Sequence, residues 1–245
     1  MSKNYDEKTK ESVVSSLKKK LTQWVPKYVS TKLIVAVYGL LNFLCLIGRK
    51  KREQNFRHNL SLLEVSNSPL KEGYIENQNQ WGDIRFGKTT MAFAGCEIMA
   101  VYNAILAMRK DNTIDSSDCE ILRDFGGCES ICRLISDFEK DGAALQGWIG
   151  SSPYSIKRYL KKHGIRTRFV WKMDKLSDAK VAIATVYNDA EDLYSQIHTI
   201  AFSKEEDGYM SHNALICKRG CQTLKEAVKS VSNNPKLICA IEILN

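Results

Sequence analysis

Several patterns that mark common protein classes are missing from this chain. It has no ribonucleoprotein aromatic signature, no complete zinc finger and no helix-turn-helix pattern, so nothing favours binding to nucleic acid. It has no phosphate-binding loop, because Gly87-Lys88-Thr89 lacks the glycine spacing that such a loop needs upstream. It shows no internal repeat and no cleavable signal peptide. These absences exclude the most recognisable nucleotide-dependent and nucleic-acid-binding classes.

Cysteine is also too sparse to form a disulfide framework. Eight cysteines are scattered over 245 residues, whereas small secreted domains that depend on disulfides are far denser in cysteine. We therefore expect a reduced, intracellular setting. Two pairs, Cys128 with Cys132 and Cys217 with Cys221, could together hold a structural zinc. Their spacing is wider than that of zinc knuckles and one pair lies on an apolar helix face, so core cysteines are favoured and no cofactor is predicted.

The composition that is present is that of a globular protein with a basic N-terminal part. Hydrophobic residues make up 44% and charged residues 26% of the chain, which argues against disorder. The formal net charge is +8, and much of the excess lies in residues 18–20 and 49–52. A basic end beside an apolar stretch favours contact with an anionic membrane surface.

The apolar stretch runs from Leu33 to Gly48 and follows an amphipathic helix predicted over residues 6–24. Its sixteen residues would rise about 24 Å as a helix, short of the roughly 30 Å hydrocarbon core of a bilayer. A tilted membrane-spanning helix, an in-plane anchor and a buried helix of the domain all remain open. We expect a basic helical segment over residues 1–64, a polar linker over residues 65–80 and a compact domain over residues 81–245.

The compact domain shows helical patterns first and strand patterns last, which predicts an α+β fold. The expected helices span residues 92–110, 116–123, 129–140, 153–163 and 223–231. The expected strands span residues 166–171, 180–187, 197–202, 209–217 and 237–244.

Cys96 is the candidate nucleophile. It follows Gly95 at the start of a long apolar helix, where backbone N–H groups stabilise a thiolate and lower the pKa of the thiol. Gly95 permits a sharp turn, and the Cys96 amide is a natural oxyanion donor.

His198 is the preferred base among only four histidines. His58 and His163 lie in basic, polar surroundings, whereas His198 opens a predicted strand and can point across a cleft. Asn213 follows fifteen residues later, after a predicted hairpin, and can accept a hydrogen bond from the second ring nitrogen of His198. His212 is the alternative histidine.

This combination resembles the papain-like cysteine peptidases. It is most similar to the bacteriocin-leader-processing peptidases, which cut after double glycines, and to their stand-alone bacterial relatives. The matching features are Trp81-Gly82-Asp83, the Gly95-Cys96 elbow, the turn Ser152-Pro153-Tyr154 and the His198 strand. The resemblance covers residues 74–245.

The resemblance implies a papain-like fold, Cys96, His198 and Asn213 as catalytic residues, and an upstream glutamine in the oxyanion hole. Gln78 is the preferred glutamine and Gln80 the alternative. It also implies a peptide or protein substrate and a bacterial protein in the cytoplasm or at a membrane. The chain departs from the family in having Glu97-Ile98 where many relatives have Gly-Pro, and Asn213 where the bacteriocin-processing type has aspartate.

Two functions follow as hypotheses. The first is a thiol hydrolase that forms an acyl-enzyme on Cys96 with His198 as base. The second is an inactive descendant of the same fold that acts as a binding or membrane-tethered interaction module.

Overall fold

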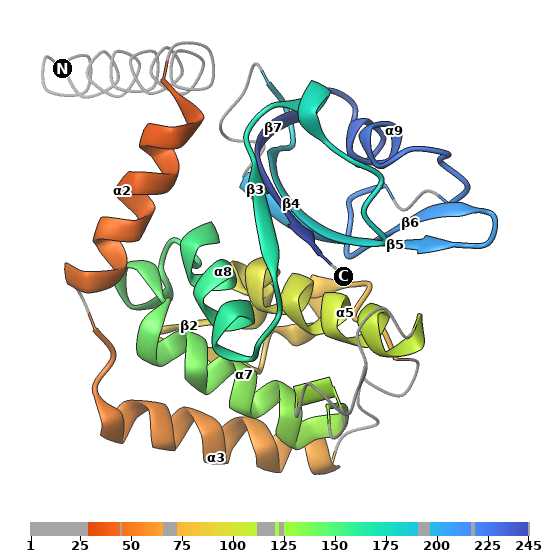
Figure 1. The fold of residues 1–245 in the computed structure, drawn as a ribbon. Helices are drawn as coiled ribbons and strands as arrows, with labels where there is room; N and C mark the ends of the chain where they lie inside the picture. The colour runs from red at the N-terminus through yellow and green to blue at the C-terminus, as the bar shows by residue number, and fades with distance from the viewer. Residues whose placement is uncertain are drawn as a thin grey trace, which may run out of the picture.

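The structure is a computed structural model that describes residues 29–44, 46–65, 73–111, 121–122, 125–190, 197–216 and 219–244. It is a mixed α and β protein in which most helices precede an antiparallel sheet (Figure 1). The α+β prediction is confirmed at this level. The predicted helices at 6–24 and, for the most part, 116–123 fall outside the described residues.

The main sheet has five strands in the order β3-β7-β4-β5-β6, and every neighbouring pair is antiparallel. A second sheet pairs two short strands, β1 and β2. The strands of both sheets are β1 (Arg85–Phe86), β2 (Thr89–Thr90), β3 (Thr167–Val170), β4 (Val181–Tyr187), β5 (Ile197–Glu205), β6 (Gly208–His212) and β7 (Lys236–Ile243). The strand predicted at 209–217 stops at His212, because Asn213 adopts a left-handed backbone with φ of 59°.

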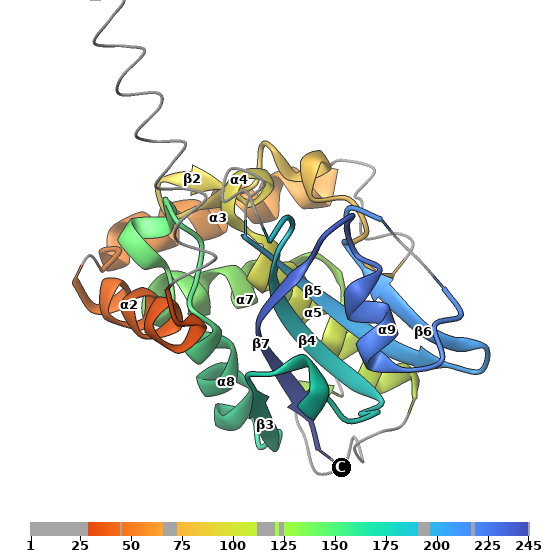
Figure 2. The same ribbon diagram turned by 90° about the horizontal axis from the view of Figure 1, so that it is seen from above.

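Helices cover both faces of the main sheet (Figure 2). Alternate residues of a strand point to opposite faces, so β5 contributes Ala201 to the core shared with α5, and Ile200 and Phe202 to the core shared with α9. The helices of the domain are α4 (Met91–Ala94), α5 (Cys96–Lys110), α7 (Gly127–Asp141), α8 (Pro153–Lys162) and α9 (Leu224–Lys229), with short 3₁₀ turns η1 (Gln78–Trp81), η2 (Ala144–Gly147) and η3 (Met173–Lys175).

The start of α8 follows from local chemistry. Ser152 is the N-cap, and its hydroxyl accepts a hydrogen bond from the Tyr154 amide at 3.2 Å. Pro153 at the first helical position has no N–H that would need a partner. The predicted helix start is confirmed.

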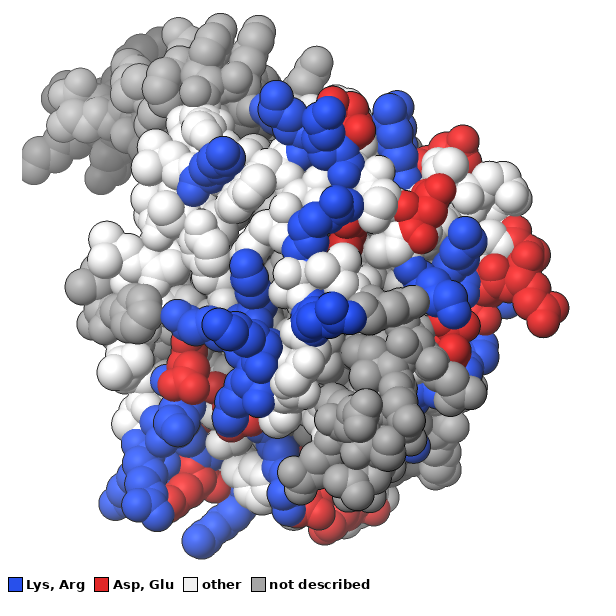
Figure 3. All heavy atoms as spheres, in the orientation of Figure 1, with Lys and Arg blue, Asp and Glu red and all other residues white. Residues whose placement is uncertain are grey.

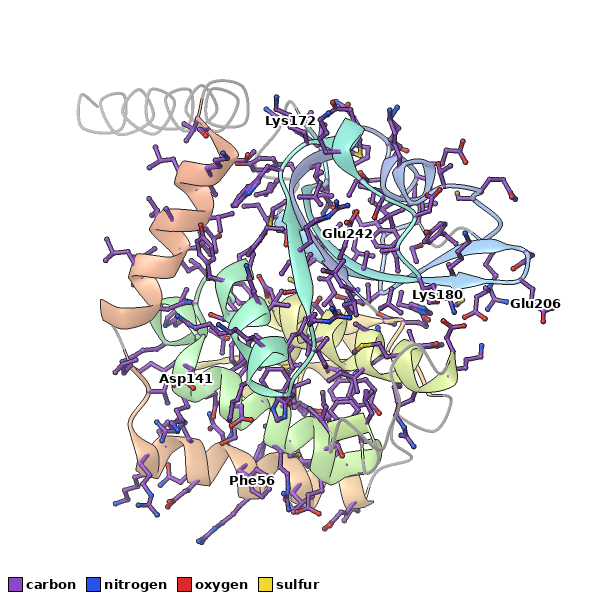
Figure 4. The ribbon with its side chains drawn as sticks, viewed as in Figure 1. Phe56, Asp141, Lys172, Lys180, Glu206 and Glu242 are labelled. Carbon is purple, nitrogen blue, oxygen red and sulfur yellow. The ribbon has the colours of Figure 1, made fainter. Side chains whose placement is uncertain are left out.

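The described part of the N-terminal segment is not separate from the domain. It forms α2 (Thr31–Leu44) and α3 (Arg49–Val65), and α3 packs against α7 with Phe56 and Leu63 in contact with the main core (Figures 1 and 4). Asn55 donates to the Gly87 carbonyl at 2.9 Å and to Glu139 at 2.5 Å. The boundary expected at residue 64 therefore does not separate two independent parts, and deleting α3 would leave buried polar groups without partners.

Residues 73–80 likewise do not form a free linker. Ile75 is buried in the main core, and its backbone N–H and C=O both bond to the Asn103 side chain. Residues 66–72 of the expected linker lie outside the described residues. In the described part of the chain, no helix has both the length and the apolar composition required to cross a bilayer.

Candidate active site

The elbow before Cys96 is a break between two helices rather than the interior of one. The sequence predicted a continuous helix from residue 92, but α4 ends at Ala94 and α5 begins at Cys96. Gly95 lies between them, and its N–H bonds to the Met91 carbonyl at 2.9 Å. A Cβ atom at Gly95 would lie 2.6 Å from the Met91 carbonyl oxygen, so the elbow requires glycine for space. Cys96 is thereby placed on the first residue of α5, as predicted.

We expect Gly95→Ala to destabilise the fold by about 1–3 kcal/mol, the usual cost of forcing atoms into a packed site. The Met91 backbone cannot move away from the new methyl group without disturbing α4. Gly82→Ala is the matched control, because its backbone is already helical and no atom lies within 4 Å of the added Cβ. Urea unfolding of both variants gives the comparison; equal losses would show that the elbow tolerates a side chain.

The Cys96 thiol is buried and bonded to the carboxyl group of the next residue. Its Sγ donates to Glu97 Oε2 at 3.2 Å. Burial and the nearby charge of Glu97 raise the pKa of the Cys96 thiol well above its ordinary value, although hydrogen bonds with Thr199 act in the opposite direction. In this conformation the thiol is therefore neutral at physiological pH, and the benefit expected from the helix N-terminus is outweighed.

Glu97 is itself an unusual carboxyl group. It is 4% exposed, and burial raises its pKa to about 7 against the hydrogen bonds from its own amide, Cys96 and the Ser151 amide. The loop after η2 covers it so closely that a Cβ atom on Gly150 would lie 3.1 Å from both carboxyl oxygens. Tyr38 of α2 is close enough that, after burial, the charges of Glu97 and Cys96 raise its phenol pKa. In the sequence, Glu97 stood out only as a departure from the family pattern.

His198 lies on β5 but does not hydrogen-bond Cys96. Thr199 is the β5 residue whose hydrogen bonds reach Cys96, and its hydroxyl also bonds to Thr185 on β4 at 3.0 Å. Because neighbouring residues on a strand alternate, His198 points to the opposite face, the face of its partner Val186. Its Nε2 lies 2.5 Å from the Asn213 carbonyl oxygen and so donates to it, and burial lowers the pKa of the ring.

The structure does bring Gln78 and Asn213 together. The Gln78 amide N–H donates to Asn213 Oδ1 at 2.9 Å, and Asn213 Nδ2 donates to Gln78 Oε1 at 3.3 Å. Gln78 Nε2 donates to the carbonyl of Ala92, in α4 just before the elbow, at 2.9 Å. Asn213 was expected to bind the His198 ring through its side chain, but it does so through its backbone. The oxyanion role predicted for Gln78 is also not formed here, because its amide is bonded to α4.

A second polar chain was missed. His212 Nδ1 lies 2.7 Å from Glu76 Oε1, and His212 Nε2 lies 2.9 Å from the Ser203 hydroxyl. The ring stacks on Tyr74 at 3.8 Å between centroids. Glu76 Oε2 also accepts from the Asn213 amide at 3.0 Å, which fixes the end of β6. Glu76 lies in the stretch that was expected to be a linker, so nothing in the sequence indicated that it belongs to the site.

The cysteine pairs do not assemble into a metal site in the described part of the chain. Cys128 and Cys132 lie on α7, and the Cys128 thiol donates to the Leu63 carbonyl at 3.3 Å. Cys221 lies after β6, next to the Ser230 hydroxyl at 3.8 Å, and Cys217 is outside the described residues. No group of three or more His, Cys, Asp or Glu side chains within the described ranges is placed to hold a metal ion.

Comparison of the chain with protein-family models, with curated proteins and with solved structures finds no match.

Proposed function

We propose that this chain is a papain-like thiol hydrolase, a cysteine peptidase that forms an acyl-enzyme on Cys96, and that the conformation described is latent. The supporting observation is that segments far apart in the sequence meet near the Gly95–Cys96 elbow. The Gly95–Cys96 turn opens α5, and next to it Gln78, Asn213 and His198 form one continuous chain of hydrogen bonds that reaches α4. These residues come from four separate segments, in the Cys, His, Asn order of papain-like peptidases.

Latency follows from the partners of the thiol. Cys96 donates to Glu97 and lies next to Thr199, and Tyr38 of α2 lies close to the same carboxyl group. In the active form His198 would accept the Cys96 proton, the thiolate would attack the peptide carbonyl, and the leaving amine would take that proton from His198. Water would then hydrolyse the thioester and restore the thiol. His198 is the second residue of β5, so bringing its side chain to the face of Cys96 requires the start of that strand to give up its pairing with Val186 and Tyr187 of β4.

The second candidate is a binding module that does not cut its ligand. The Cys96–Glu97 hydrogen bond and the raised pKa of the Cys96 thiol favour it, because a neutral, buried thiol is a poor nucleophile. Both candidates predict a peptide ligand. They differ in whether bound peptide reacts covalently with Cys96.

An electrophilic peptide probe separates the two. If the chain is a latent peptidase, the folded protein should be modified at Cys96, and His198→Ala should slow that modification by about 10² or more, since the base that activates the thiol is gone. Asn213→Ala should slow it moderately. His212→Ala is the matched histidine control, because His212 bonds to Glu76 and Ser203 instead.

Peptide mapping of the modified protein gives the result. Cys239 is the internal reference, a buried thiol whose pKa burial raises to about 12. If Cys96 reacts no faster than Cys239, or if His198→Ala has no effect while His212→Ala abolishes reaction, the proposed dyad fails. Slow labelling of every cysteine together with measurable peptide binding would favour the binding module.

A further inference from the structure

The outer face of α2 is an exposed apolar surface. Leu33, Val37 and Leu40 recur at helical spacing on one side, and they are 56%, 45% and 59% exposed. The opposite side packs on the domain through Val35 and Asn42, which are buried. Leu46, directly after the helix, is 61% exposed and continues the apolar surface toward α3. Large aliphatic side chains exposed together on one helix indicate an interaction surface.

The start of α3 adds positive charge next to this face. Residues 49–52 are Arg-Lys-Lys-Arg, with Arg49 and Lys50 exposed and the other two half-buried. Only Arg49 of the four has an ion pair within the described residues, with Glu53 at 2.8 Å. Arg52 donates to the Ile47 carbonyl at 2.7 Å and so fixes the corner between the two helices. Figure 3 shows basic side chains gathered where α3 begins and a mostly uncharged surface over α2, in which Lys32 is the one charged residue.

A cavity of about 670 Å³ opens at the same corner, and Leu46 is one of the residues that line it. Phe138 and Tyr159 line it together with the cations Lys140, Arg158, Lys161 and Lys162 and the carboxylates Asp137 and Asp141, of which Asp137 pairs with Lys162 at 3.9 Å. Asp141 is the last residue of α7 (Figure 4). Asn42 reaches the cavity from α2, and its Oδ1 is buried without a hydrogen-bond partner among the described residues. The corner thus combines apolar walls, an excess of cations over carboxylates and one acceptor without a partner in the described part of the chain.

We propose that α2 lies in the plane of an anionic membrane surface, with Leu33, Val37, Leu40 and Leu46 in the outer acyl region. Residues 49–52 would contact lipid phosphates, and the cavity would accept a headgroup. An apolar helix face combined with neighbouring lysines and arginines is the pattern that binds interfacially rather than spanning the bilayer. The charge complementarity selects a lipid surface over an uncharged protein partner. Membrane binding through α2 is independent of any catalysis by Cys96.

The test is co-sedimentation of the full chain with vesicles of phosphatidylcholine, with and without about one third phosphatidylglycerol. Binding should require the anionic lipid and weaken as salt is raised. The triple variant Leu33→Glu, Val37→Glu, Leu40→Glu should lose at least about tenfold in affinity, because charges replace the inserted side chains. Val65→Glu with Leu215→Glu is the matched control, since both residues are exposed and apolar but lie away from α2.

A charge variant tests the same surface without touching the apolar row. Arg49→Gln with Lys50→Gln should weaken binding by about fivefold for each residue removed. Circular dichroism shows whether each variant folds. Equal binding to neutral and anionic vesicles, or unchanged binding by the triple variant, overturns the proposal. The proposal is also overturned if the wild-type protein is a dimer that does not bind vesicles while the triple variant is a monomer. In that case a second copy of the chain covers this face.

Discussion

Replacing Glu97 by glutamine is expected to raise the rate at which iodoacetamide alkylates Cys96 by about tenfold or more near pH 8. Glu97 Oε2 accepts a hydrogen bond from the Cys96 Sγ at 3.2 Å. When Glu97 is ionised, its negative charge also disfavours a thiolate at Cys96. The neutral amide removes that repulsion while keeping the size of the side chain. A fall of one unit in the thiol pKa already gives a tenfold larger thiolate fraction below that pKa.

Glu139→Gln is the matched control. Glu139 is also a buried carboxyl with a pKa raised to about 7 by burial, but it bonds to Asn55 and to the Gly87 amide rather than to a cysteine. It should leave the alkylation of Cys96 unchanged. If Glu97→Gln also leaves the rate unchanged, burial alone suppresses Cys96, and release from the latent form must come from movement of the elements that cover it.

The second large effect expected is on the pH dependence of stability. Burial raises the Glu139 pKa from 4.5 to about 7, so between these values the folded protein binds more protons than the unfolded chain. The free energy of unfolding then falls as pH rises through this window and is level above it. The shift corresponds to about 3 kcal/mol lost between the two ends of the window. Glu97, with the same direction and cause, adds a loss over the same range.

Urea unfolding of wild type and Glu139→Gln across this range isolates the contribution of Glu139. The difference in unfolding free energy between the two proteins should change by about 3 kcal/mol from the acid end to the alkaline end, in favour of the glutamine variant at high pH. The two proteins are compared because His198 changes the stability in the opposite direction. Burial lowers the pKa of His198, so its contribution to the free energy of unfolding rises with pH in both proteins and cancels in the difference. A difference that stays constant with pH would show that the pKa of Glu139 is the same in the folded and the unfolded protein.

Local chemistry alone predicted many elements. The Ser152 cap and Pro153 determine where α8 begins, and Gly95 before Cys96 marks an elbow, because each effect depends on a residue and its immediate neighbours. Thr223 starts α9 through a reciprocal capping box with Glu226, another pattern within four residues. The order of the patterns, with helices first and strands last, likewise predicted the α+β class. These features need no knowledge of what lies across the fold.

The role of α3 was decided by tertiary structure. The inner face of α3 mixes two buried asparagines, Asn55 and Asn59, with the apolar residues that contact the core, which are Phe56, Leu60 and Leu63. The two asparagines are buried because the backbone of residues 85–87 offers them hydrogen bonds. The sequence predicted a helical segment here, but these asparagine hydrogen bonds, which hold α3 on the domain, leave no signal in the hydrophobic pattern.

The candidate site shows the same division. The sequence identified Cys96, Gln78, His198 and Asn213 as residues able to support thiol chemistry, and three of them are joined by hydrogen bonds. The register of β5 against β4 decides which of its residues face the elbow. In the structure Thr199, rather than His198, contacts Cys96. A shift of a single residue exchanges the two faces of a strand, and the free energy that sets the register is spread over the whole sheet. For that reason the residue types could be chosen from sequence, whereas the hydrogen-bond partner of the thiol could not.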